Sequence, residues 1–143
     1  MRMRMPTLQF AWNEEMSVGI PEVDEDHKRF ISLINDLNRS IMSRMASSEI
    51  KQYLQAIIDD AEKHFAKEEV LFKEWQYPDA EGHAKIHAKV LHTLDEIKKQ
   101  FIPYGHDSDW VDAGVKIKKL LVDHILKEDM KYADYYRNSV LPK

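Results

Sequence analysis

Seven side chains that could bind metal occur along this chain at spacings suited to two ions. They are five histidines and two carboxylates: His27, His64, Glu68, His83, His87, His124 and Asp129. The pairs His64/Glu68 and His83/His87 are each four residues apart, and such residues lie on one face of an α-helix, one turn apart. Each pair could therefore chelate one ion or reach two neighbouring ions.

The types of ligand favour a pair of transition-metal ions such as iron. The chain has no cysteine, which excludes a thiolate site and a disulfide framework. Imidazole suits iron, copper, zinc and nickel, whereas magnesium and calcium prefer oxygen ligands. Seven ligands are too many for one ion. If both carboxylates and one further oxygen bridge two octahedral ions, one position stays open for a small ligand.

The number of anionic ligands bears on the chemistry. Ferritin-like di-iron sites use Glu-x-x-His motifs, and this chain contains no such motif. Fewer anionic ligands should stabilise high-valent iron less. The ligand set therefore favours reversible O2 binding over oxygenase chemistry.

The apolar residues recur every three and four positions and predict four helices, over about 24–45, 49–75, 80–101 and 108–138. Nothing alternates with period two, so we expect no strands. Long helices with short connections predict an all-α, up-down-up-down four-helix bundle. We expect a single domain, with an N-terminal arm at residues 1–22 and the bundle at 23–143.

This bundle would bring the seven residues to one level. His27 lies near the start of the first predicted helix, and His64 near the end of the second. Because neighbouring helices are antiparallel, we expect all seven within about two turns of one another. The seven residues share a helix face with apolar residues, so we expect their side chains to face the core. Polar groups without partners are costly there. Metal coordination would satisfy all of them.

Two of these assignments have alternatives. Considered alone, His64 and Glu68 fit an ordinary exposed pair on a helix. His124 and Asp129 are five positions apart, which rotates them by about 140° on an ideal helix. Glu128 is the more natural partner of His124 by spacing, unless a π-bulge reorients Asp129.

Other residues of possible interest fall outside the pattern. His92 and His106 are off the predicted level, and we expect both to face solvent. Tyr132, Tyr135 and Tyr136 are expected to be packing residues and not redox partners.

The composition limits the range of partners and locations. The chain has 143 residues, 43% hydrophobic and 32% charged, as in a globular protein. A net charge of −4 gives no sign of the basic surface that would bind nucleic acid or an anionic membrane. No apolar run reaches membrane-spanning length, and the start MRMRMPTLQF is too interrupted for a signal peptide. We expect a cytoplasmic protein without membrane insertion, most simply a monomer.

Several short stretches, in order, resemble the hemerythrin family, and within it the stand-alone bacterial hemerythrins. They cover the chain from Trp12 to about Tyr136. The stretches are Trp12-Asn13-Glu14, VGIPEVDEDHKRF, His64 to Glu69, the His83/His87 pair, and His124-Ile125 followed by Asp129.

The resemblance implies a non-haem di-iron centre with an oxo or hydroxo bridge. One iron would be held by three histidines, and the other, which binds O2, by two. The carboxylates would bridge the irons, and O2 would take two electrons and be held as a hydroperoxide. The implied sets are His83, His87 and His124; His27 and His64; and the bridging Glu68 and Asp129.

The resemblance also implies an apolar pocket that protects bound O2. Phe30 and Leu121, each one helical turn from a histidine, are our candidates, although both also fit as ordinary core residues. We expect an O2-binding protein, not an enzyme, for carriage, storage or delivery. An oxygen-consuming enzyme is a candidate recipient. The alternative is a di-iron enzyme or iron-handling protein that reduces O2, peroxide or nitric oxide, or an O2 sensor acting through a partner.

Overall fold

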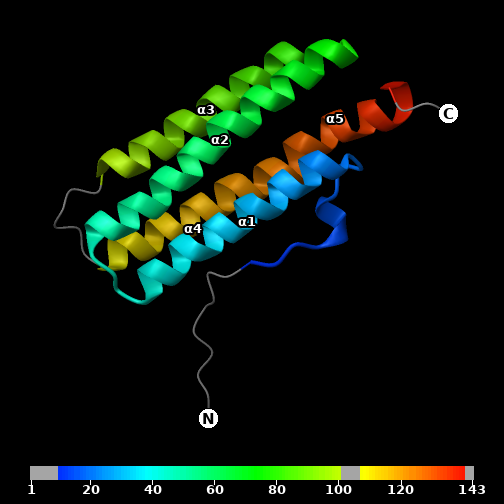
Figure 1. The fold of residues 1–143 in the computed structure, drawn as a ribbon. Coiled ribbons are helices and arrows are strands. Elements are labelled where there is room, and N and C mark those ends of the chain that lie inside the picture. The colour runs from blue at the N-terminus through cyan, green and yellow to red at the C-terminus, as the bar shows by residue number, and fades with distance from the viewer. Residues whose placement is uncertain (1–9, 101–106, 141–143) are drawn as a thin grey trace.

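Four long helices dominate the computed structural model, which describes residues 10–100 and 107–140 (Figure 1). No strand occurs in these ranges, so the predicted all-α bundle is confirmed. A 3-10 turn at Glu14–Met16 precedes the bundle, and a π-helical turn at His124–Glu128 joins the fourth helix to a fifth. The helices are α1 (Pro21–Met42), α2 (Ser47–Trp75), α3 (Ala80–Gln100), α4 (Asp107–Asp123) and α5 (Asp129–Tyr135), and a second π-helical turn follows at Tyr136–Val140.

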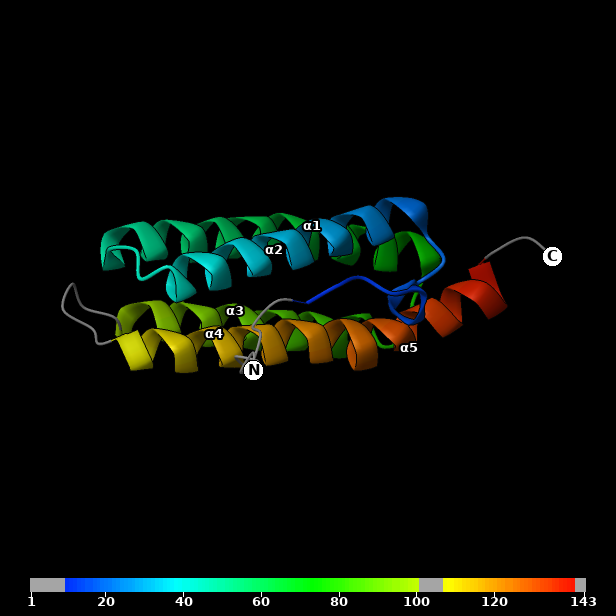
Figure 2. The same ribbon diagram turned by 90° about the horizontal axis from the view of Figure 1, so that it is seen from below.

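The helices run alternately in opposite directions. Figure 2 shows α1 beside α2 in one layer and α3 beside α4 in the other. The start of α1, the end of α2, the start of α3 and the end of α4 therefore meet at the same end of the bundle (Figure 1). This arrangement brings together residues that are far apart in the sequence.

The largest differences from the predicted helix boundaries are in the first and fourth helices. Helix α1 begins at Pro21, about a turn earlier than expected, since proline fits the first turn, where its missing N–H is not needed. The predicted fourth helix is not one regular α-helix, because the π-helical turns interrupt and end it. The predicted break near residues 102–105, residues 1–9 of the arm, and His106 lie outside the described residues.

Apolar side chains hold together the half of the bundle that lies away from the starts of α1 and α3. The main cluster includes fully buried residues from all four long helices: Ile34, Leu54, Ile57, Leu94 and Ile117. Each such burial contributes about 1.5–3 kcal/mol relative to an exposed side chain. This apolar cluster therefore packs the four long helices against one another.

The described part of the N-terminal arm packs against the bundle. The backbone N–H of Phe10 donates to Asn35 Oδ1, and Asn35 Nδ2 donates to the Phe10 carbonyl, both at 2.7 Å. The side chain of Met16 is fully buried in a cluster with Ile31, Val122 and Ile125. This segment therefore covers the face between α1 and α4. The division at residue 22 stays a prediction.

None of the described helices combines the length and apolar character needed to cross a membrane.

Candidate metal centre

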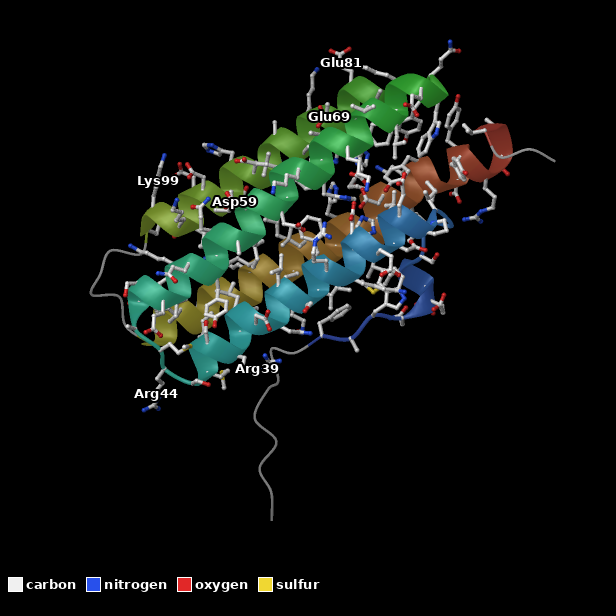
Figure 3. The ribbon with its side chains drawn as sticks, in the orientation of Figure 1. Arg39, Arg44, Asp59, Glu69, Glu81 and Lys99 are labelled. Atoms are coloured by element: carbon white, nitrogen blue, oxygen red, sulfur yellow. The ribbon has the colours of Figure 1, made fainter. Side chains whose placement is uncertain are left out.

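The seven candidate ligands lie together in the interior, each at most 5% exposed. Figure 3 shows nitrogen- and oxygen-bearing side chains between the helices, whereas the labelled Arg44, Glu81 and Lys99 project outward. The seven form two overlapping groups that share Glu68, and within each group the ligand atoms lie within 4.8 Å of one another. The groups are Glu68, His83, His87, His124 and Asp129, and His27, His64 and Glu68.

Glu68 presents one oxygen to each histidine group. Its Oε1 lies 2.9 Å from His87 Nε2. Its Oε2 lies 3.2 Å from His64 Nε2 and 3.9 Å from His27 Nε2. A carboxylate in this position is arranged to bridge two ions.

Asp129 repeats this arrangement from the other side of the site. Its Oδ1 lies 3.2 Å from His83 Nε2 and 3.1 Å from His124 Nε2. Its Oδ2 lies 3.1 Å from His27 Nε2. Both carboxylates therefore face a group of three histidines with one oxygen and a group of two with the other.

The π-helical turn explains why Asp129 and not Glu128 reaches the site. The backbone N–H of Asp129 donates to the carbonyl of His124, five residues earlier, which is the hydrogen bond of a π-turn. The wider turn brings Asp129 back to the face of His124. Glu128 is directed towards Lys131, at 3.1 Å, and is partly exposed. Spacing alone would have favoured Glu128.

Several site atoms are buried without a hydrogen bond. They include Nε2 of His83, His87 and His124, Oε1 of Glu68, and both carboxylate oxygens of Asp129. The atoms approach one another to 2.9–3.2 Å, but not in the orientation of hydrogen bonds. Buried polar atoms without partners are costly and uncommon. Lone pairs that converge in this way fit cations placed between them, so the donor set fits a pair of metal ions.

Two outer carboxylates orient the proposed ligands. Asp26 Oδ2 lies 2.9 Å from His64 Nδ1, and Glu69 Oε2 lies 3.1 Å from His87 Nδ1. Each would accept the ring N–H and leave Nε2 to face the centre, as is usual for metal-bound histidine. Asp26 is itself held by Lys67 at 3.2 Å and Arg29 at 3.1 Å. Helical spacing does not reveal these contacts, because the two residues of each pair lie on different helices.

Without metal, the pKa values of several histidines and carboxylates in the site are shifted towards the charged forms. Burial opposes charge on His64, but its hydrogen bond with Glu68 outweighs this and raises the His64 pKa to about 9. Burial also opposes charge on Glu68, yet His64 and His87 lower the Glu68 pKa to about 2. The pKa of Asp129 likewise lies well below its usual value, despite burial, because His124 faces it. The carboxylates are therefore ionised, as bridging ligands must be.

Tyr132 contacts the site from α5. Its side chain is fully buried, and its O–H donates a hydrogen bond to Oε2 of Glu68. Burial, together with the charges of Asp129 and Glu68, raises the Tyr132 pKa well above its usual value. The phenol therefore stays protonated and acts as a donor. The sequence analysis assigned Tyr132 to packing alone.

A small cavity lies beside the group of two histidines. It offers about 10 Å3 to the centre of a water-sized molecule, close to the space that one such molecule needs. Both predicted pocket residues, Phe30 and Leu121, line it. So do Phe65 and Ile125, which were not among the predicted pocket residues. The remaining wall consists of His27, His64, His124 and Asp129.

Phe65 also packs directly against a proposed ligand. Its ring stacks on His87, with centroids 4.0 Å apart and an angle of 6° between the planes. Of the histidines outside the centre, His92 is exposed as predicted.

The fold and the site define a class of protein, the helical bundle whose core carries a cluster of histidines and carboxylates able to hold metal. The chain matches the family model for the hemerythrin HHE cation binding domain over residues 18–136. It therefore belongs to the hemerythrin family, as its sequence resemblance predicted.

Similar individual proteins support membership of the hemerythrin family. The chain is 29% identical to a bacteriohemerythrin of Stenotrophomonas maltophilia (strain R551-3) over 126 residues, 87% of this chain and 79% of that protein. It is 33% identical to a myohemerythrin of Theromyzon tessulatum over 124 residues, 86% of this chain and 90% of that protein. A hemerythrin-like protein of Naegleria gruberi is 31% identical over 129 residues, 86% of this chain and 90% of that protein.

Proposed function

We propose that this chain binds O2 reversibly at a non-haem di-iron centre. The observation that carries the proposal is the paired orientation of Glu68 and Asp129, each with one oxygen towards either histidine group. In the proposed centre His83, His87 and His124 would hold one iron, and His27 and His64 would hold the other. Glu68 and Asp129 would be shared between them. Membership of the hemerythrin family supports this assignment.

The cavity supports the choice of ligand and of iron. It adjoins His27 and His64, so an iron held by these two histidines would lie beside it. Phe30, Leu121 and the other apolar walls admit a small apolar molecule and disfavour water and ions. When bound, the iron pair supplies the two electrons that O2 accepts, and the apolar wall slows their irreversible loss.

The same features argue against catalysis as the main role. The cavity has space for a molecule about the size of O2 and none for an organic substrate beside it. We therefore propose that the protein is not an enzyme, and that it serves oxygen carriage, storage or delivery. The cytoplasmic location, the monomeric state and the recipient of the oxygen stay predictions from the sequence.

The test is spectroscopic. The iron-loaded protein is reduced without air, exposed to O2 and then purged with argon while its visible spectrum is recorded. A charge-transfer band that forms and then disappears, with about two irons per chain, is the expected result. Immediate conversion to a stable diferric spectrum would favour an enzyme or iron-handling protein that reduces O2, peroxide or nitric oxide. Protein that takes up no iron would end the proposal.

A further inference from the structure

A row of aromatic side chains leads from the proposed centre to the surface, at the end of the bundle where α2 ends and α5 lies. Its members are Tyr132 on α5, Trp75 at the end of α2, and Tyr136 directly after α5. Tyr132 is fully buried, whereas Trp75 and Tyr136 are half-buried. Reversible O2 binding needs none of these side chains to be oxidisable.

The inner end of the row touches two proposed ligands. The Tyr132 hydroxyl donates to Glu68, and its ring centroid lies 5.5 Å from the ring of His83. A phenol in this position is in contact with a bridging carboxylate and with an imidazole of the three-histidine group.

The outer steps are equally short. The ring centroids of Tyr132 and Trp75 are 5.9 Å apart, and those of Trp75 and Tyr136 are 4.9 Å apart. The hydroxyl of Tyr135 donates to the Trp75 carbonyl at 2.8 Å, which helps to hold the end of α2 in place. Phenol and indole lose one electron far more readily than phenylalanine or aliphatic side chains. Neighbouring members of the row are thus close enough for rapid electron transfer.

We propose that Tyr132, Trp75 and Tyr136 form a route along which oxidising equivalents leave the metal centre and reach the surface. The proposal rests on the di-iron O2 site proposed above. O2 that leaves such a site with both electrons leaves as hydrogen peroxide, so the site meets this oxidant during its own work. A route to the surface would carry the damage away from the ligands.

The electrons and protons balance as follows. One hydrogen peroxide takes two electrons and two protons and gives two waters. Tyr132 would give up these electrons one at a time and be refilled through Trp75 and Tyr136. When Tyr132 is oxidised, its proton moves to the Glu68 oxygen that it bonds, and it returns on reduction. Two molecules of a donor in solution that each lose one electron and one proton, such as ascorbate, would restore Tyr136 and supply the two protons that the peroxide takes up.

The test treats the diferric, iron-loaded protein with a few equivalents of hydrogen peroxide. Radicals are followed by freeze-quench electron paramagnetic resonance, and oxidised residues are located by peptide mass spectrometry. Iron content and the reversible O2 spectrum are recorded first on the same sample. We expect a protein radical, with oxidation products at Trp75 and Tyr136, and ascorbate should suppress these products.

Trp75→Phe is the decisive variant, because phenylalanine keeps most of the packing and cannot carry the electron. We expect several-fold less product at Tyr136 and faster loss of iron per peroxide consumed. Trp12→Phe is the matched control, since Trp12 is also half-buried but, within the described part of the chain, its ring contacts neither Tyr132 nor Tyr136. It should behave as the unmodified protein.

Three outcomes would overturn the route while leaving the O2 site intact. They are equal oxidation of Trp12 and Trp75, an unchanged yield at Tyr136 in Trp75→Phe, and the same products from metal-free protein. A sample that holds no iron or shows no reversible O2 band would instead overturn the proposed function, and the route with it.

Discussion

Oδ1 of Asp129 lies 3.1 Å from Nε2 of His124, although five positions of one helical segment separate the two residues. The π-helical turn between them makes this contact possible. A regular α-helix would turn the carboxylate away from the imidazole by about 140°.

Replacing Asp129 should therefore impair the metal centre more than replacing its neighbour. We expect Asp129→Ala to weaken iron binding by more than the ~10–100-fold typical of losing an outer-shell partner. Glu128→Ala is the matched control, because Glu128 pairs with Lys131 at the surface. The iron content of each variant after dialysis measures its loss of iron binding. The assignment is wrong if Glu128→Ala loses the iron and Asp129→Ala keeps it.

The contact between Asp26 and His64 predicts an effect of a residue that does not bind metal. Asp26→Ala leaves His64 Nδ1 without its carboxylate acceptor. We expect iron affinity to fall about 10–100-fold, first at the ion held by His27 and His64. Anaerobic titration with ferrous iron measures this loss. Asp59→Ala, which removes an exposed acid of α2 (Figure 3), should leave the titration unchanged.

Leu121 should protect bound O2. Leu121→Ala enlarges the cavity beside His27 and His64, and we expect it to cost about 2–5 kcal/mol of stability. Water can then enter, so the O2 adduct should decay faster to the diferric state. The decay of the visible band measures the rate. Leu126→Ala, a change at an exposed leucine, should decay at the original rate; equal rates in the two variants would contradict the role of Leu121.

The N-terminal segment that contains Met16 should also slow the decay of the O2 adduct. Met16 is buried against Ile125, and Ile125 lines the cavity. We expect Met16→Ala to loosen this cover, destabilise the fold by about 2–5 kcal/mol and speed the loss of the O2 adduct. Met42, which is 42% exposed, provides the control substitution. Indistinguishable decay rates for Met16→Ala and Met42→Ala would show that the segment does not seal the cavity.

The stability of the metal-free protein should fall as the pH rises from neutral. The His64 pKa is raised from 6.5 to about 9, so charged His64 stabilises the fold fully below pH 6.5 and this stability is lost as the pH passes about 9. The raised pKa of His124 acts in the same direction. The loss should be on the order of 1–3 kcal/mol.

Thermal unfolding from pH 6 to pH 10 measures this effect. With iron bound, His64 is neutral at every pH of this range, so the loaded protein should not share the decline. His92→Gln, which alters an exposed histidine, should keep the decline. A melting temperature that rises across this window in metal-free protein would contradict the proposed His64–Glu68 pair.

The sequence determined the bundle of four long helical segments, the approximate level of the seven candidate ligands and their place in the core. These properties are local. Apolar periodicity marks the buried face of each helix, and a count of residues from each turn gives the level along the axis. The choice of Phe30 and Leu121 as pocket residues followed from the same counting, from the nearest histidine on the helix.

Only the tertiary structure decided how these side chains meet. It placed Asp129 and not Glu128 beside His124, because a π-turn depends on packing and is not encoded in helical spacing. It showed that Asp26 and Glu69 hold the outer nitrogens of histidines on other helices, and that Tyr132 bonds Glu68 across the bundle. These contacts depend on the rotation of each helix about its axis and on side-chain rotamers, which follow from the packing of all the helices together.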